Sequence, residues 1–180
     1  MILLANQEIR SLAYKRRAKL TDQEVACFSK HIVDKLLPYL KGRVASYKAY
    51  GKEVNLSGIE SCPNIEAIAY PRTYEDASME FLPSDDNTQF VRSAYGIEEP
   101  TSGIPWDPQS IDVILVPLVA FDEQCHRIGH GKGYYDRYLT QVDCLKIGVA
   151  FSAQKVEELH PESHDIMMDL IITEDALYHK

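Results

Sequence analysis

The chain lacks several features that mark common protein classes. Its four cysteines lie far apart and form no CxxC pair, which argues against a zinc knuckle and a disulfide framework. Its longest apolar run, residues 111–120, is interrupted by an aspartate and a proline, and it falls short of the roughly 20 residues that a membrane-spanning helix needs. The sequence therefore predicts no membrane contact and reduced thiols at Cys27, Cys62, Cys125 and Cys144.

Positive charge is also scarce. The formal net charge is -8, whereas general nucleic-acid binding needs a surplus of lysine and arginine. Residues 1–20 are the exception, because they carry five basic side chains and one acidic one. Their order does not match a secretory signal, in which a basic segment precedes an apolar one. We therefore expect a cytoplasmic protein with no nucleic-acid partner.

Chain length and composition favour one globular domain. A 45% share of hydrophobic residues among 180 is enough to fill a core. No internal repeat, low-complexity tract or flexible linker divides the chain. We therefore predict a single domain over residues 1–180 and expect a monomer whose partners are small molecules.

Two helices are predicted near the start of the chain. Apolar residues at helical spacing beside the basic residues of segment 1–20 indicate a basic amphipathic helix. Thr21 and Glu24 then form a capping-box pattern. The apolar residues that follow at helical steps predict a second helix that ends near Gly42.

The remainder alternates between strand-like and helix-like segments. β-Branched runs predict strands over residues 43–50, 65–70, 111–116, 145–151 and 169–173. Helices are compatible with residues 55–61, 132–141 and 153–159, whereas residues 72–106 are expected to form loops beside the site. This alternation predicts a three-layer α/β fold, with helices on both faces of a mainly parallel central sheet.

A glycine-rich segment carries the strongest functional signal. Gly129, Gly131 and Gly133 lie within five residues of one another, after a predicted strand and before a helix-compatible segment. Alternating glycines let the backbone direct several amide N–H groups toward one anion. Because α/β proteins bind anionic ligands at such strand-to-helix connections, the segment predicts a phosphate-binding loop.

Charged neighbours strengthen this prediction. Arg127 and Lys132 can neutralise phosphate oxygens, and Asp136 can bind a bridging Mg²⁺ ion. The spacing matches neither the Walker A loop nor the Rossmann glycine pattern, so it implies neither ordinary P-loop chemistry nor NAD. A flexible turn without a ligand is the simpler alternative. A weaker one is zinc binding by histidines four residues apart, at His126 with His130 and at His160 with His164.

The same segment resembles the signature of a known family. Residues 121–139, with Arg127, the three glycines and the Tyr-Tyr-Asp run at 134–136, look like the 5-formyltetrahydrofolate cyclo-ligases, also called methenyltetrahydrofolate synthetases. Weaker similarity covers nearly the whole chain. The resemblance implies a ligase that uses ATP and Mg²⁺ to cyclise 5-formyltetrahydrofolate to 5,10-methenyltetrahydrofolate, giving ADP and phosphate through a phosphorylated formyl (imidate) intermediate.

The resemblance also assigns roles to residues. Lys132 and Arg127 would act in catalysis, and Asp136 and Asp165 would bind Mg²⁺. Glu53 would bind the pterin, because a carboxylate matches adjacent ring N–H and amino donors. Substrate contacts would come from Glu53, Arg10, Tyr134 and Tyr135. ATP contacts would come from Arg10, Arg127, Gly129, His130, Gly131, Lys132, Gly133, Tyr134, Tyr135 and Asp136.

Three positions depart from the family pattern. Asn6 stands where a lysine is usual, Cys125 where a turn glycine is common, and His130 at a variable position that is often arginine. Two alternative functions stay open. One is a non-catalytic module that binds folate or a nucleotide, for which Asn6 is the hint. The other is an ATP-independent α/β enzyme that uses the loop to hold a phosphosugar or a CoA-like anion.

Overall fold

A seven-stranded sheet organises the structure, a computed structural model that describes residues 5–180. Its strand order is β11-β10-β9-β6-β1-β2-β3. The inner strands β10, β9, β6, β1 and β2 run parallel, and the edge strands β11 and β3 are antiparallel to their neighbours. The strands are β1 (Gly42–Ala45), β2 (Ile65–Thr73), β3 (Met79–Ser84), β6 (Val113–Pro117), β9 (Leu145–Val149), β10 (Leu170–Ile172) and β11 (Leu177–His179).

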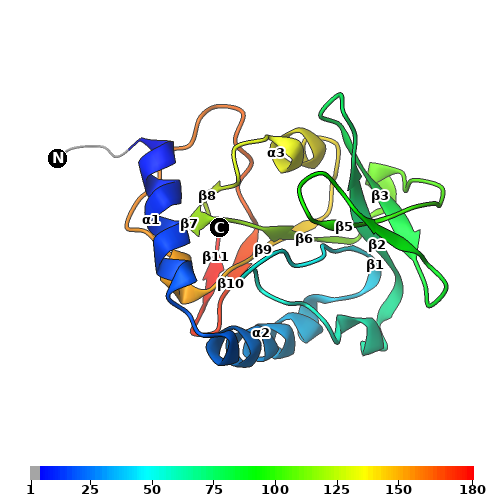
Figure 1. The fold of residues 1–180 in the computed structure, drawn as a ribbon, viewed down its shortest axis with the longest axis horizontal. Helices are drawn as coiled ribbons and strands as arrows, with labels where there is room; N and C mark the ends of the chain where they lie inside the picture. The colour runs from blue at the N-terminus through cyan, green and yellow to red at the C-terminus, as the bar shows by residue number, and fades with distance from the viewer. Residues whose placement is uncertain (1–4) are drawn as a thin grey trace.

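Helices cover both faces of this sheet, as predicted. Figure 1 shows α2 (Asp22–Leu36) on one side and α3 (Tyr134–Leu139) on the other. The central strand β6 divides its side chains between them, because successive residues of a strand point to opposite faces. Val113 and Leu115 pack into the core beneath α2, and Ile114 and Val116 into the core beneath α3. The predicted three-layer α/β fold is confirmed.

The N-terminal helix α1 (Asn6–Ala18) packs at the side of the sheet, next to the short hairpin of β7 (Ala120–Phe121) and β8 (Arg127–Ile128) (Figure 1). Ile9 and Ala13 are buried against Val119, Ala120 and Ile128. The rest of the helix carries the basic residues. The predicted amphipathic helix therefore forms, and it lies against the segment that leads into the glycines.

Helix α2 begins as the sequence predicts and ends earlier. The backbone N–H of Glu24 donates to Thr21 Oγ1 over 3.1 Å, and the Thr21 N–H donates to the Glu24 carboxylate over 2.8 Å. The α-helix stops at Leu36 and tightens into a 3-10 turn, η1 (Leu37–Tyr39), well before Gly42. Pro38 explains the early end, because it has no N–H to donate and its ring crowds the preceding turn.

Two segments predicted as helices form only single 3-10 turns, η2 (Ile59–Ser61) and η4 (Ser152–Gln154). In the first, the Asn55 side chain accepts a hydrogen bond from the Ser57 N–H, which offers the backbone a local alternative to a helix. In the second, the Gln154 side chain is buried and donates to the carbonyl oxygens of Leu118 and Val119. Tertiary contacts thus replace helix propensity here.

The prediction of loops over residues 72–106 is wrong. This region holds the edge strand β3 and a second hairpin of β4 (Phe90–Arg92) with β5 (Glu98–Pro100). These strands are short and lack strong alternation, so they form through pairing with neighbours rather than through local propensity. The predicted strand over 43–50 also shortens to β1, and Tyr47, Lys48, Tyr50 and Glu53 in the segment after it line a cavity.

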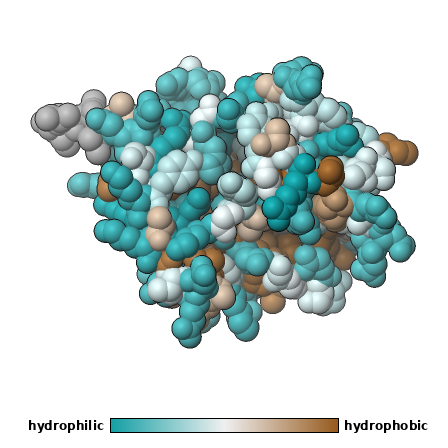
Figure 2. Space-filling view, viewed as in Figure 1, coloured by the Kyte–Doolittle hydropathy of each residue, from teal (hydrophilic) through white to brown (hydrophobic). Residues whose placement is uncertain are grey.

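The surface is mostly polar. Figure 2 shows hydrophilic residues over most of one face, with apolar residues visible mainly in a recessed area. The described residues contain no helix both long and apolar enough to span a bilayer. The prediction of no secretory signal depends in part on the apolar start of the chain. Residues 1–4 of that start lie outside the described residues.

Candidate functional site

One cavity of about 570 Å³ collects every residue that the sequence nominated for the site. It lies where β1 and β6 end, since Tyr47 follows β1 and Pro117 closes β6. The chain continues from β1 to β2 on one side and reaches β6 on the other, so this is a switch point of the sheet, where α/β folds bind ligands. The nominated residues lining it are Arg10, Glu53, Arg127, Gly129, His130, Gly131, Lys132, Gly133, Tyr134, Tyr135, Asp136 and Asp165.

The glycine loop needs two of its three glycines for backbone reasons. Gly131 and Gly133 have φ values of +93° and +73°, in the left-handed region that residues with a Cβ rarely occupy. A Cβ at Gly133 would also lie 2.8 Å from a guanidinium nitrogen of Arg137. Gly129 has no positive φ, and its carbonyl accepts a hydrogen bond from Arg10 Nε over 2.8 Å. Helix α1 therefore holds the start of the loop.

Arg127 is a buried cation at the floor of the cavity. Its side chain is 3% exposed, and its Nη2 donates to Asp136 Oδ1 over 2.6 Å. Burial lowers the pKa of Arg127, and the charges of Asp136 and Asp165 oppose that shift. The Arg127 Nε is buried and has no hydrogen-bond partner within residues 5–180. Because buried donors are nearly always satisfied, this guanidinium is suited to an anionic ligand.

Lys132 is an exposed residue of the glycine loop that also lines the cavity. Its Nζ is 5.2 Å from the ring centroid of Tyr95, in the turn between β4 and β5. The Arg137 side chain donates to the Lys132 carbonyl over 3.0 Å. The ammonium group therefore borders the cavity through a cation–π contact rather than an ion pair.

Glu53 is a buried carboxylate that lines the same cavity and contacts the glycine loop. One of its oxygens accepts from the backbone N–H of Tyr50 over 2.9 Å, and the other lies 3.1 Å from His130 Nε2. The neighbouring lysines contact other groups: Lys52 donates to the carbonyl oxygens of Ala18 and Leu20, and Lys48 lies over the Tyr70 and Phe90 rings. The carboxylate faces the cavity instead.

Two tyrosines border Glu53 inside the protein. Burial raises the pKa of Tyr47 and of Tyr135, and the charge of Glu53 raises both further. Both phenols therefore stay neutral. The Tyr47 hydroxyl donates to the Val54 carbonyl over 2.8 Å, which fixes the segment that carries Glu53.

Asp136 and Asp165 lie at the same end of the cavity. Asp136 Oδ1 also accepts a hydrogen bond from the Ile166 N–H over 3.4 Å, which brings the segment containing Asp165 against α3. Asp165 Oδ2 accepts from the Glu162 N–H over 2.8 Å. Within residues 5–180, no group of three or more histidine, cysteine, aspartate or glutamate side chains is placed to hold a metal. Neither histidine pair that the sequence suggested for zinc lies in such a group.

Several cavity residues were missed by sequence reasoning. Tyr14 lies four residues beyond Arg10 and eight beyond Asn6, and all three line the cavity; that spacing on one helix face is a signal that could have found it. Tyr95 and Glu99 come from the hairpin that was predicted as loop. Glu99 is buried and accepts from both the N–H and the hydroxyl of Thr73. No local pattern marks it.

Cys125, the departure from a turn glycine, keeps the turn. Its φ is +67°, and its N–H donates to the Asp122 carbonyl over 3.2 Å. Its side chain is buried, with Sγ 3.3 Å from the Tyr178 carbonyl oxygen. The turn before the phosphate loop therefore takes a glycine-like conformation with a cysteine in it.

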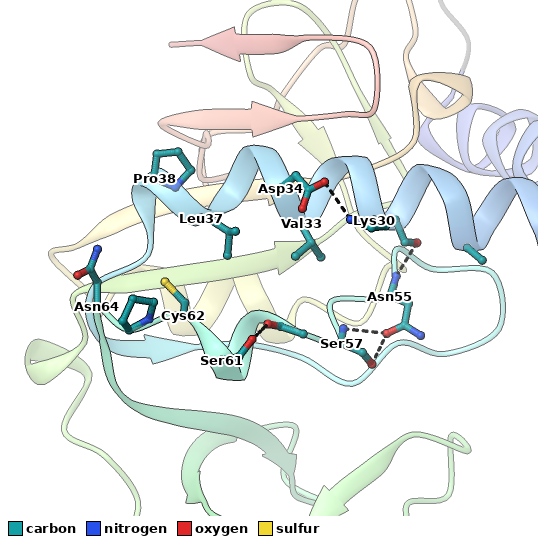
Figure 3. A pocket seen from close by; sticks show the side chains of 14 residues that line it. Lys30, Val33, Asp34, Leu37, Pro38, Asn55, Ser57, Ser61, Cys62 and Asn64 are labelled. Carbon is teal, nitrogen blue, oxygen red and sulfur yellow. Dashed lines mark hydrogen bonds and ion pairs between the residues drawn. The ribbon is translucent and has the colours of Figure 1, made fainter.

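A second hollow of about 800 Å³ lies between α2 and residues 55–64 (Figure 3). Its polar groups are largely satisfied among themselves: Lys30 pairs with Asp34, the Asn55 N–H donates to Ser29, and the Ser57 hydroxyl donates to Asn55. The sequence nominated none of its residues, and we assign it no function.

The geometry defines an α/β protein with a glycine-rich loop and a cavity at the switch point of its sheet. Comparison with known proteins agrees. The sequence profile of the 5-formyltetrahydrofolate cyclo-ligase family matches residues 5–174, and the chain belongs to this family of enzymes.

Individual relatives cover almost the whole chain. The 5-formyltetrahydrofolate cyclo-ligase of Mycoplasma pneumoniae is 30% identical over 178 residues, 93% of this chain and 97% of the relative. The NMR structure of Aquifex aeolicus 5,10-methenyltetrahydrofolate synthetase is 32% identical, with a TM-score of 0.86 over 98% of this chain and 93% of that one. A Mycoplasma pneumoniae 5,10-methenyltetrahydrofolate synthetase structure is 27% identical, with a TM-score of 0.79 over 95% and 99% of the two chains.

Proposed function

We propose that this protein cyclises 5-formyltetrahydrofolate to 5,10-methenyltetrahydrofolate at the expense of ATP. The observation that carries the proposal is the single cavity in which a phosphate-type loop and a buried carboxylate, Glu53, face the same space. A reaction between a nucleotide and a pterin needs one anion-binding end and one end that recognises ring N–H donors. Membership of the cyclo-ligase family supports the same substrates.

At the phosphate end, Arg127 and Lys132 would contact ATP together with the amides of Gly129 to Gly133. Arg127 brings a buried Nε that has no hydrogen-bond partner among residues 5–180, and it is held in place by Asp136. Arg10 would add charge from α1, because it already contacts the loop at Gly129. Phosphoryl transfer requires mainly positioning and neutralisation of developing charge, and these groups can supply both.

Glu53, which lines the same cavity, would bind the pterin. Its carboxylate has two oxygens with about four acceptor sites, of which Tyr50 and His130 occupy one on each oxygen. The remaining sites can accept the two adjacent N–H donors of a pterin in a fork. Tyr135 and Tyr134 would border the rings, since both line the cavity.

The proposed reaction balances as follows. The oxygen of the formyl group on N5 attacks the γ-phosphorus. ADP leaves, which gives a phosphorylated imidate. N10 then attacks the imidate carbon and loses its proton, and the C–O bond breaks as phosphate leaves and takes up one proton as hydrogen phosphate. The products are 5,10-methenyltetrahydrofolate, ADP and phosphate. The residues of this chain would align the formyl oxygen with the γ-phosphate and keep water from the cavity.

Mg²⁺ fits the site as an ion shared with the nucleotide. Mg²⁺ usually binds one or two carboxylates, together with phosphates and water, so a cage of three protein ligands is not required. Asp136 and Asp165 are the carboxylates at the phosphate end, and Asp136 keeps one oxygen beyond the one that contacts Arg127. When bound, the ion would neutralise phosphate charge.

The direct test mixes the protein with Mg-ATP and 5-formyltetrahydrofolate and follows the absorbance of methenyltetrahydrofolate. We expect ATP-dependent product. Folate binding without turnover would instead favour a non-catalytic module, and binding of a phosphosugar or CoA without ATP use would favour an ATP-independent enzyme.

A variant tests the phosphate assignment within that assay. Lys132→Ala removes an exposed side chain whose contact is the Tyr95 ring, so the fold should survive. We expect the KM for ATP to rise at least about tenfold, the loss of one charge-assisted contact, with little change in the KM for the folate. Unchanged ATP kinetics would show that Lys132 does not contact the phosphates.

A cytoplasmic location, a monomeric state and a single domain over residues 1–180 stay predictions.

A further inference from the structure

Three side chains from distant parts of the sequence form a hydrogen-bonded row among the residues that line the cavity. The Tyr14 hydroxyl of α1 is 2.6 Å from His130 Nδ1, and His130 Nε2 is 3.1 Å from Glu53 Oε1. The Tyr14 and His130 rings also stack, with centroids 5.9 Å apart and planes 30° apart. The row therefore links α1, the glycine loop and the buried carboxylate of Glu53.

The chemistry of the groups sets the direction of each hydrogen bond. An ionised carboxylate only accepts, so the His130 Nε2 carries the proton and donates to Glu53. In the neutral ring, Nδ1 then accepts from the Tyr14 hydroxyl. Both ring nitrogens are thus engaged by protein groups. His130 has no free N–H for a phosphate oxygen while this row is intact, which differs from the ATP contact that the family resemblance implies.

Glu53 is the buried end of the row, and protein donors fix its carboxylate. The Glu53 side chain is 8% exposed and the His130 side chain is 42% exposed. The other Glu53 oxygen is held by the Tyr50 N–H, so each carboxylate oxygen has one protein donor and the plane of the group is set. A carboxylate that receives two N–H donors in a fork must have its plane aligned with the incoming ring.

We propose that His130 is a positioning residue that holds Glu53 for the folate substrate, with Tyr14 holding His130 in turn. This inference rests on the proposed function, because it assumes that Glu53 meets the pterin. Arg10 ties α1 to the carbonyl of Gly129, the residue before His130. Through Arg10 and Tyr14, the seating of α1 on the loop is coupled to the orientation of the folate-binding carboxylate.

Steady-state kinetics with both substrates varied separate positioning from phosphate contact. His130→Ala should raise the KM for 5-formyltetrahydrofolate about tenfold, as expected for a lost hydrogen bond to a charged group. The KM for ATP should change less than about twofold. His130→Gln, which keeps an N–H donor near the position of Nε2, should recover most of the loss. Tyr14→Phe should raise the folate KM by about threefold.

A matched control removes a different anchor of α1. Arg16 donates to the Lys155 carbonyl over 3.0 Å and does not line the cavity. Arg16→Ala should leave both KM values unchanged, whereas a change equal to that of Tyr14→Phe would mean that any loosening of α1 has the effect. That result would overturn a specific role for the row.

Other outcomes also decide the matter. A rise in the KM for ATP alone after His130→Ala would make His130 a phosphate contact, and a His130→Gln variant no better than His130→Ala would exclude the Glu53 hydrogen bond as the cause. Calorimetric binding of 5-formyltetrahydrofolate separates the two proposals. No binding to the unmodified protein would refute the proposed function, whereas binding that His130→Ala leaves equally tight would refute the positioning role alone.

Discussion

The ion pair between Arg127 and Asp136 predicts that removing either partner destabilises the protein, and that the two losses differ. The Arg127 side chain is 3% exposed and the Asp136 side chain 24%. Arginine stays charged in proteins, so removing Asp136 leaves a buried cation whose compensating charge is lost. Removing Arg127 leaves a carboxylate that water can reach. We therefore expect the aspartate substitution to cost more.

The magnitudes follow from burial. Removing one partner of a fully buried pair costs about 3–5 kcal/mol. Because Asp136 is partly solvated, Asp136→Ala should lower the free energy of unfolding by about 2–4 kcal/mol. Arg127→Met keeps apolar volume in place of the guanidinium stem and should cost about 1–2 kcal/mol. The loss of unfolding free energy in the double variant should be about 1–3 kcal/mol smaller than the sum of the two single losses.

Urea unfolding with linear extrapolation measures all three variants, provided that the slope is unchanged. Asp34→Ala is the control, because Asp34 forms an exposed pair with Lys30, with side chains 57% and 75% exposed. That pair should contribute less than about 0.5 kcal/mol. The reasoning is refuted if Asp136→Ala costs no more than the control, or if Arg127→Met is the more damaging change.

Two further predictions concern α2 and the thiols. Thr21→Ala should destabilise the protein by about 1 kcal/mol through loss of the helix cap, while Thr21→Ser should not; equal urea midpoints for the two variants would contradict this. In the native protein at pH 8, an aromatic disulfide reagent should modify exposed Cys27 quickly and the other thiols slowly. Burial raises the pKa of Cys125 and of Cys144 to about 11, so only about a thousandth of either is thiolate at that pH. Two fast-reacting thiols would refute it.

Local patterns predicted the elements that local physics controls. The capping box at Thr21 and Glu24 marks the start of α2, and the β-branched run of β6 marks a strand buried on both faces. The glycine spacing predicted a loop, and two of its glycines do adopt left-handed backbone. These features depend on residues within a few positions of one another, so one sequence suffices to find them.

Long-range pairing escaped the same reasoning. The β4–β5 hairpin forms where loops were expected, and its members Tyr95 and Glu99 reach the cavity. Glu99 is fixed by Thr73, at the end of β2 and 26 positions earlier. Thr73 and Glu99 are too far apart in sequence for a local pattern to include both, so nothing local could indicate the contact.

From periodicity, glycine spacing and charge, the sequence by itself predicted the fold class and a phosphate-type loop with Arg127, Lys132 and Asp136 beside it. The other candidate residues, Arg10, Glu53, Tyr134, Tyr135 and Asp165, came from the resemblance to a known family. Only the tertiary structure decided what those residues do to one another. It buries Arg127 against Asp136, and it places Tyr14, His130 and Glu53 in one row across 116 and 77 positions of sequence separation. Hydrogen bonds and desolvation depend on distances in space, and these are set when α1 and the loops pack against the sheet.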